Sequence, residues 1–157
     1  MKQKSAPDPE MVLQKIRYFC SYQERCRKET EEKLKDWAVQ RKLIPGILRD
    51  LEKEGFLSEE RFAKVFAGGK FRQNKWGRQK IGFELKLRGI PEDLIKKGLS
   101  AIDEDAYRMA LYDLIRRKEK EIKRGEQRNI REKIINFAHG KGFEMEIILT
   151  ALKKLKI

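Results

Sequence analysis

Residues 88–99 read Arg-Gly-Ile-Pro-Glu-Asp-Leu-Ile-Lys-Lys-Gly-Leu, and residues 141–152 read Lys-Gly-Phe-Glu-Met-Glu-Ile-Ile-Leu-Thr-Ala-Leu. In both stretches a glycine and a large apolar residue precede, at the same spacing, an apolar pair and a final leucine. Glycine is a common residue just after a helix, and the apolar spacing that follows fits one face of the next helix. A looser copy occurs earlier, with Ile47 and Leu51 at two of the apolar positions. The chain therefore repeats a helical unit about every 45–55 residues, which is typical of helical solenoids.

Capping residues and turn residues divide the whole chain into units of this kind. Almost every segment has the helical period, and Asp8, Ser58 and either Asp103 or Asp105 are suitable N-caps. We predict an all-α protein of three tandem three-helix repeats, at 8–57, 58–102 and 103–157, after a flexible tail at 1–7. Stacked in series, these repeats would form an elongated, curved solenoid of roughly 60–75 Å. The alternative is one irregular globule of nine helices.

The apolar spacing also predicts which side chains are buried. In a helix starting near Arg27 the expected inward residues are Leu34, Trp37 and Ala38. In the helix that follows Ser58 they are Phe62, Val65 and Phe66. Gly68 and Gly69 are expected to weaken the middle of that helix or to bend it.

The charge of the chain points to a polyanionic partner. Its 157 residues include 38 Lys and Arg against 25 Asp and Glu, which gives a formal net charge of +13. A positive potential of this size favours the capture of nucleic acid or of a nucleoprotein surface. A merely soluble, charge-rich helical protein is the alternative.

Residues 70–88 carry the most one-sided basic cluster. Against a single acid, Glu84, this segment has seven basic residues: Lys70, Arg72, Lys75, Arg78, Lys80, Lys86 and Arg88. Arg88 follows Glu84 by four residues, so we expect a local ion pair there. We predict that phosphates are bound by the other exposed members: Arg72, Lys75, Arg78, Lys80 and Lys86. Phe71 and Trp76 are candidates for stacking on bases, with a position in the core as the alternative.

A second basic run, at 116–133, is interrupted by glutamates. Mixed signs of this kind predict an exposed helix whose charges are partly neutralised within the run. We expect it to add to the overall positive field rather than to form a specific site.

Catalytic chemistry has few residues available. His139 is the only histidine, and Cys20 and Cys26 are the only cysteines, so neither a metal-ligand set nor a nucleophile with its base is apparent. We therefore expect no enzymatic activity and no cofactor. The two cysteines cannot form a disulfide framework, and the sequence has neither an apolar leader nor a membrane-spanning run. These features predict a cytoplasmic protein.

Three phrases of the sequence, in this order, resemble the RecX family of bacterial regulators. Residues 24–34 resemble the first-repeat phrase of that family, with Cys26 in place of its serine and Thr30 in place of its first leucine. Residues 51–63 resemble its linking phrase, and Ser58 stands where the family usually has an acid. Residues 77–99 follow the order of its second repeat, with Gly77-Arg78 at the start and Arg88-Gly89-Ile90 further on. The match extends over about residues 10–102, and the third repeat matches mainly in pattern.

The resemblance implies a negative modulator of RecA that lies in the groove of the RecA–DNA filament and suppresses its ATPase and strand-exchange activities. It implies a RecA nucleoprotein filament as partner, weak binding to DNA, no membrane, and a role in DNA repair, recombination and the SOS response; we also expect a monomer. The alternative function is a stand-alone helical nucleic-acid-binding module. Cys26 is a poorer N-cap than serine, so the start of the second helix is expected to lose up to about 1 kcal/mol.

Overall fold

The computed structural model describes residues 6–125 and 128–157, and its regular structure in these ranges is entirely helical. The helices are α1 (Pro9–Tyr22), α2 (Arg27–Asp36), a 3-10 turn η1 (Arg41–Leu43), α3 (Ile44–Lys53), α4 (Glu59–Asn74), α5 (Arg78–Leu87), α6 (Glu92–Ser100), α7 (Glu104–Lys123), α8 (Ile130–Gly140) and α9 (Met145–Leu155). Most of the predicted tail, residues 1–5, lies outside the described residues.

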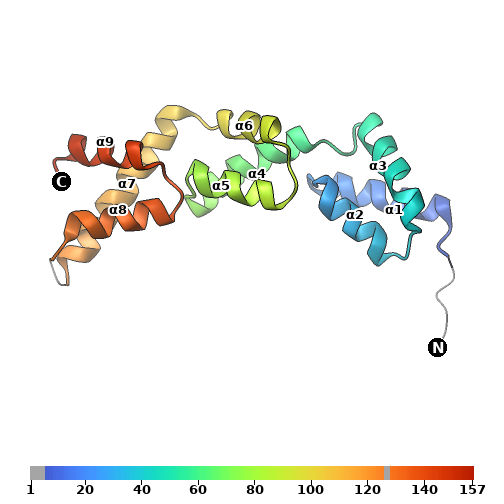
Figure 1. Ribbon diagram of the computed structural model, residues 1–157, viewed down its shortest axis with the longest axis horizontal. Coiled ribbons are helices and arrows are strands. Elements are labelled where there is room, and N and C mark those ends of the chain that lie inside the picture. The colour runs from blue at the N-terminus through green and yellow to red at the C-terminus, as the bar shows by residue number, and fades with distance from the viewer. Residues whose placement is uncertain (1–5, 126–127) are drawn as a thin grey trace.

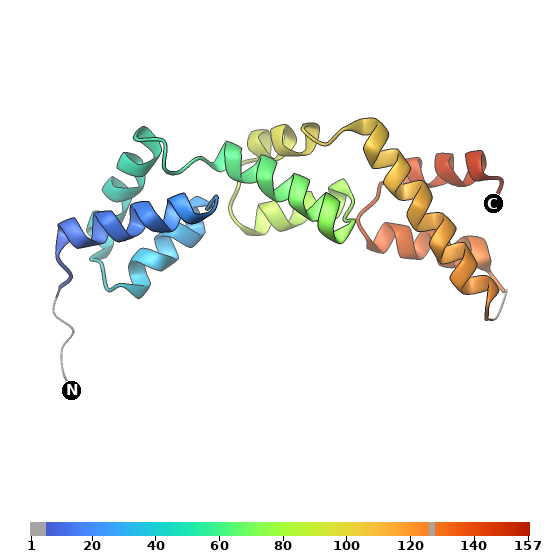
Figure 2. The same cartoon turned by 180° about the vertical axis from the view of Figure 1, so that it is seen from behind.

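The helices follow one another as three groups in a row, which gives the molecule an elongated and gently curved shape (Figures 1 and 2). The group α1–α3 lies at one end, α4–α6 in the middle and α7–α9 at the other end. The predicted all-α repeat fold is confirmed, and a single irregular globule is not formed. The repeat boundaries predicted at 57–58 and 102–103 fall between α3 and α4 and between α6 and α7.

Two hydrophobic cores hold this row together. The N-terminal group has its own core, built around Ile16, Leu34 and Leu51. The middle and C-terminal groups share a second core, to which Tyr107 and Phe143 contribute the largest fully buried side chains. The expected stacking of neighbouring repeats is therefore continuous between the second and third groups. Between the first and second groups, Cys26 at the start of α2 packs into the shared core.

The predicted N-caps are formed by short side chains. Asp8 accepts a hydrogen bond from the amide of Glu10 at 3.2 Å, and Ser58 accepts one from the amide of Arg61 at 3.2 Å. Of the two candidates before α7, Asp103 is the cap, and it accepts from the Ala106 amide at 2.9 Å. Each bond satisfies one of the free amides in a first helical turn.

The start of α2 is held by acidic side chains. The Glu29 carboxylate accepts a hydrogen bond from the Cys26 amide at 2.9 Å, and the Glu59 carboxylate accepts one from the Arg27 amide at 3.3 Å. Thr30 is fully buried, and its hydroxyl donates to the Cys26 carbonyl at 2.9 Å. A polar residue at this core position is thus satisfied by the backbone one turn earlier.

The expected burial at the end of α2 is corrected. The helix ends at Asp36, Trp37 follows it half-buried, and Ala38 is exposed in the left-handed conformation with φ 61°. The turn at Ala38 brings Val39 into the core instead. Because α2 ends just before Trp37 and Ala38, these two residues leave the buried face that the apolar spacing assigned to them.

Two expectations for α4 are also corrected. Val65 is 58% exposed, and the buried face of α4 includes Ala63 and Ala67 as well as Phe62. Small residues are required there because α6 packs closely on this face, so that a Cβ added to Gly98 would lie 2.9 Å from the Ala63 backbone. The helix continues without a break through Gly68 and Gly69, since the tertiary contacts outweigh the low helix propensity of glycine.

Candidate functional site

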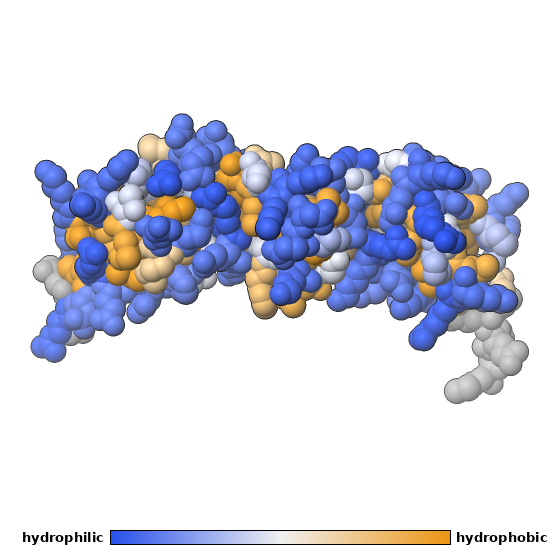
Figure 3. Space-filling view, turned by 45° about the horizontal axis from the view of Figure 1, so that its top comes forward, coloured by the Kyte–Doolittle hydropathy of each residue, from blue (hydrophilic) through white to orange (hydrophobic). Residues whose placement is uncertain are grey.

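The predicted basic segment lies at the end of α4 and along α5, in the middle of the row (Figure 1). Hydrophilic side chains cover most of the molecular face shown in Figure 3, and apolar patches interrupt them. Each predicted site residue therefore needs to be placed individually, because burial and pairing decide which of them can meet a partner.

The start of α5 is fixed by the loop between α8 and α9. The amide of Gly77 donates to the Lys141 carbonyl at 2.8 Å, and the amide of Gln79 donates to the Gly142 carbonyl at 2.9 Å. A Cβ on Gly77 would lie 2.3 Å from the Gly142 carbonyl carbon, so only glycine allows this approach. Loop carbonyls thus supply the N-terminal capping that Gly77 has no side chain to provide.

Arg78 completes this contact with two carboxylates from the third group. Its guanidinium lies 3.0 Å from Glu104 and 3.1 Å from Glu144, and it covers the ring of Tyr107 at 4.0 Å. The Arg78 amide donates to the Tyr107 hydroxyl at 2.9 Å, and this hydroxyl donates in turn to Glu144. We call this set (Gly77–Gln79, Glu104, Tyr107 and 141–144) the inter-repeat joint.

Electrostatics in the joint follow from these pairs. Burial and the hydrogen bond to Glu144 raise the pKa of Tyr107, so the phenol stays protonated. The hydrogen bond from Arg78 lowers the pKa of Glu104, which also pairs with Arg108 at 3.1 Å. Arg78 is therefore already neutralised, and its position indicates a structural role.

The two aromatic residues predicted to stack on bases are less exposed than base stacking requires. Phe71 is 9% exposed, and its ring packs on Tyr107 with centroids 5.7 Å apart. Trp76 is half-buried, with the Lys70 ammonium 5.1 Å and the Lys80 ammonium 4.7 Å from its ring. Phe71 belongs to the core, and lysines already occupy the approach to Trp76.

The remaining basic residues do not gather into one cluster. Arg72 and Lys75 are exposed at the end of α4, while Lys86 is exposed in the last turn of α5. Lys86 is eight residues beyond Arg78, which is about 12 Å along a helix. Arg88 pairs with Glu84 at 3.0 Å, as predicted. The structure therefore spreads the predicted residues along the length of α5.

The α5 surface also carries exposed apolar residues that the sequence reasoning missed. Phe83 is 60% exposed and Leu87 is 54% exposed. Phe83 and Lys86 line a shallow groove beside Ile95 and Leu99 of α6. The positions 83 and 87 are one turn apart and opposite the buried Ile81 and Leu85, so the helical period contained the signal. Together they form a mixed apolar and basic surface, which we call the α5 face (Phe83, Lys86 and Leu87).

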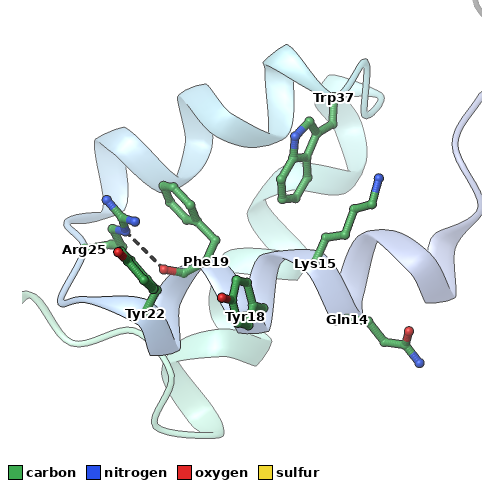
Figure 4. A pocket seen from close by; sticks show the side chains of 7 residues that line it. All are labelled: Gln14, Lys15, Tyr18, Phe19, Tyr22, Arg25 and Trp37. Atoms are coloured by element: carbon green, nitrogen blue, oxygen red, sulfur yellow. Dashed lines mark hydrogen bonds between the residues drawn. The ribbon is translucent and has the colours of Figure 1, made fainter.

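The N-terminal group carries a second surface feature that was not predicted. Tyr18, Phe19, Tyr22 and Trp37 line an open hollow of about 470 Å³ together with Lys15 and Arg25 (Figure 4). We call these six residues the aromatic shelf. Tyr18 and Tyr22 are four residues apart on α1, and their exposure could have been inferred from their position opposite Ile16 and Cys20.

The second basic run has the character that its mixed signs predicted. Arg116 and Lys123 both lie near Glu119, at 3.4 Å and 3.8 Å, and Lys118 lies 3.3 Å from Glu121. Such exposed pairs contribute little to stability but reduce the local field.

Other chemistry is sparse in the described part of the chain. Within 6–125 and 128–157 no group of three or more His, Cys, Asp or Glu side chains could hold a metal ion. In the same ranges no helix is both long enough and apolar enough to cross a bilayer. His139 is exposed near the end of α8, and burial raises the pKa of Cys26 to about 11.

Comparisons with known proteins converge on one group. Residues 58–99 match a family model described as "RecX, second three-helix domain". A protein named Regulatory protein RecX from Bacillus velezensis is 29% identical over 136 residues, covering 87% of this chain and 52% of that protein. A namesake from Chlorobium phaeobacteroides is 29% identical over 132 residues, with coverages of 84% and 85%. The chain thus spans about half the length of the Bacillus relative.

Solved structures with this fold carry the same name. The crystal structure of RecX from Lactobacillus salivarius superposes with a TM-score of 0.85 at 22% identity, covering 94% of this chain and 96% of that one. A second crystal structure of regulatory protein RecX gives a TM-score of 0.82 at 16% identity. These two likenesses establish the shared architecture.

Proposed function

The chain belongs to the RecX family, and on this premise we propose that it is a negative regulator of RecA that binds in the groove of the RecA–DNA filament. Bound there, it suppresses ATP hydrolysis and strand exchange in DNA repair and recombination. It acts as a cytoplasmic monomer and by occupancy alone, without catalysis and without a cofactor.

The elongated row of helical groups carries this proposal (Figure 1). A rod made of three groups presents contact surface along its whole length, so it can touch more than one subunit of a helical filament. The formal net charge of +13 supports a position close to DNA phosphates, because counterion release favours such contacts.

The middle group supplies the contact residues in this proposal. The exposed Phe83 and Leu87 of the α5 face suit a protein subunit, because bulky apolar side chains release water when they are covered. Four basic residues from the end of α4 and from α5 suit a position near DNA phosphates: Arg72, Lys75, Lys80 and Lys86. Arg78 acts indirectly, since its two carboxylate partners fix the start of α5.

The test is a titration of the protein into RecA that is hydrolysing ATP on single-stranded DNA. We expect the rate of hydrolysis to fall at near-equal or lower ratios of the protein to RecA. A rate that stays constant across the titration would contradict the proposal. Tight and sequence-selective binding to duplex DNA without RecA would favour the stand-alone module instead.

A pair of charge-reversal variants tests the proposed surface. The first replaces three exposed basic residues near α5: Arg72→Glu, Lys75→Glu and Lys86→Glu. The matched control makes the same change in net charge on the third group: Lys133→Glu, Lys153→Glu and Lys154→Glu. We expect the first variant to need about tenfold more protein for half-inhibition, because each lost phosphate contact weakens binding, and the control to lose much less. Equal losses would show that only overall charge matters.

A further inference from the structure

We propose that the aromatic shelf of the N-terminal group is a binding site for single-stranded DNA, with bases stacked on Tyr18 and Tyr22 and the phosphates held by Lys15, Arg25 and Lys33. The choice of DNA as the ligand rests on the proposed function. The site itself rests on the residues of α1 and α2 and is separate from the α5 face.

The two tyrosine rings are unusually open to solvent. Tyr18 is 70% exposed and Tyr22 is 71% exposed, and their ring centroids are 6.3 Å apart on successive turns of α1. Aromatic rings of this size are normally buried or covered by a partner, so an exposed pair marks a surface for interaction. Any base offers a flat π-face to such a ring, which makes stacking independent of sequence.

Positive charge lies against the other two rings of the aromatic shelf, Phe19 and Trp37. The Arg25 guanidinium lies 3.8 Å from the centre of the Phe19 ring, and its Nε donates to the Phe19 carbonyl at 3.1 Å (Figure 4). The Lys15 ammonium lies 5.8 Å from the centre of the Trp37 ring. The Lys33 ammonium lies close to both rings, at 5.7 Å from Phe19 and 5.8 Å from Trp37.

These cations have no carboxylate partner among the described residues, and three glutamates nearby are engaged elsewhere. Glu24 pairs with Arg61 at 2.9 Å, and Glu31 pairs with Lys35 at 3.3 Å. Glu29 accepts from the Cys26 amide. Within residues 6–125 and 128–157, no acid lines the hollow. The shelf therefore presents aromatic faces within an unneutralised positive field, which is the combination that single-strand binding requires.

The lining favours a nucleic-acid strand over a protein segment. Among the described residues, Gln14 is the one other residue that lines the hollow, and none of the lining residues is Val, Leu, Ile or Met. The groove at the α5 face, by contrast, includes Ile95 and Leu99, which suit apolar protein side chains. Bases in a duplex are already stacked on each other, so only a single strand can offer them to Tyr18 and Tyr22.

The test measures binding of a fluorescent thymidine oligonucleotide to the full chain, without RecA, by anisotropy. The variant Tyr18→Ala/Tyr22→Ala should bind at least about 30-fold more weakly, because two stacked bases are lost. Tyr18→Phe/Tyr22→Phe keeps both rings and should retain the affinity of the parent chain. The matched control is Val65→Ala/Met109→Ala, which removes two exposed apolar side chains from α4 and α7 and should also bind as the parent does. Circular dichroism establishes that each variant is folded.

The outcomes separate this proposal from the proposed function. An affinity of the Tyr18→Ala/Tyr22→Ala variant within about twofold of the parent would overturn the shelf, since even one lost stacking contact exceeds that change. An equal loss in the Val65→Ala/Met109→Ala control, or tighter binding to a duplex than to the single strand, would overturn it as well. A parent chain that binds the oligonucleotide through the shelf but leaves RecA unaffected would support the site and refute the proposed function.

Discussion

Replacing Tyr107 by phenylalanine should loosen the joint between the second and third groups. The hydroxyl of Tyr107 is the single atom that accepts from the Arg78 amide, at 2.9 Å, and donates to Glu144. The ring is fully buried between Phe143, at 5.0 Å, and Phe71, at 5.7 Å. Phenylalanine keeps this packing, so the change isolates the polar contacts.

The magnitude follows from what each partner loses. The Arg78 amide in the first turn of α5 loses its acceptor, and leaving a buried donor without a partner lowers the free energy of unfolding by about 1–3 kcal/mol. Glu144 also loses a hydrogen bond, although the Arg78 guanidinium remains 3.1 Å away and partly compensates for it. We therefore expect the free energy of unfolding to fall by about 1–3 kcal/mol, which moves the urea midpoint by about 1 M.

The assay is urea unfolding followed by circular dichroism, together with hydrogen exchange of the Arg78 and Gln79 amides. Tyr112→Phe is the matched control, because Tyr112 is half-buried on the same helix and its hydroxyl makes no hydrogen bond to another described residue. The control should change stability by less than about 0.5 kcal/mol. If the two variants unfold at the same urea concentration, or if exchange at α5 is unchanged in Tyr107→Phe, the joint does not depend on this hydroxyl.

Two further predictions concern the N-terminal group. Ala38→Gly should raise the free energy of unfolding by about 0.5–1 kcal/mol, because Ala38 has φ 61°, which favours glycine. Ala106→Gly, in the first turn of α7, should lower the free energy of unfolding by a similar amount. Changes of the same sign in urea melts of the two variants would contradict this reasoning. Burial raises the pKa of Cys26 from 9.0 to about 11, so the stability that its neutral thiol supplies is complete below pH 9 and is lost as the pH rises toward 11. Urea midpoints measured across this range should fall less in Cys26→Ala than in the parent, and parallel curves would show that folding does not raise the pKa of this thiol.

Much of the fold could be predicted because its signals are local. Asp8, Ser58 and Asp103 are short polar residues directly before helices, and each forms the expected cap. Gly89 and Gly142 end helices with φ of 76° and 100°, as the repeated glycine suggested. A cap or a left-handed turn is decided within a few residues, so the sequence contains the whole interaction.

The role of Arg78 could not be predicted in the same way, because its partners come from another repeat. Glu104 is 26 residues from Arg78 along the chain, and Glu144 is further still. Both reach Arg78 only because α7 and the α8–α9 loop pack on α5. In the sequence, Arg78 stands in a basic run and looks like its neighbours. Only the fold shows that it is paired while Arg72 and Lys86 are exposed.

Burial and pairing together explain how one basic chain can carry two different surfaces. At the α5 face, exposed Phe83 and Leu87 lie beside Lys86, and Arg78 nearby is neutralised by two carboxylates. Apolar contact is therefore more prominent there than charge. On the aromatic shelf the rings are accompanied by cations without carboxylate partners among the described residues, so charge and stacking act together.

Because the two surfaces lie on different groups of the row, a single strand on the first group need not displace a protein subunit bound to the second. This separation predicts that shelf variants and α5 variants have independent effects, so that their double variant loses affinity for a DNA-bound filament additively in free energy. A coupling well above about 0.5 kcal/mol in that cycle would mean that both surfaces contact the same partner.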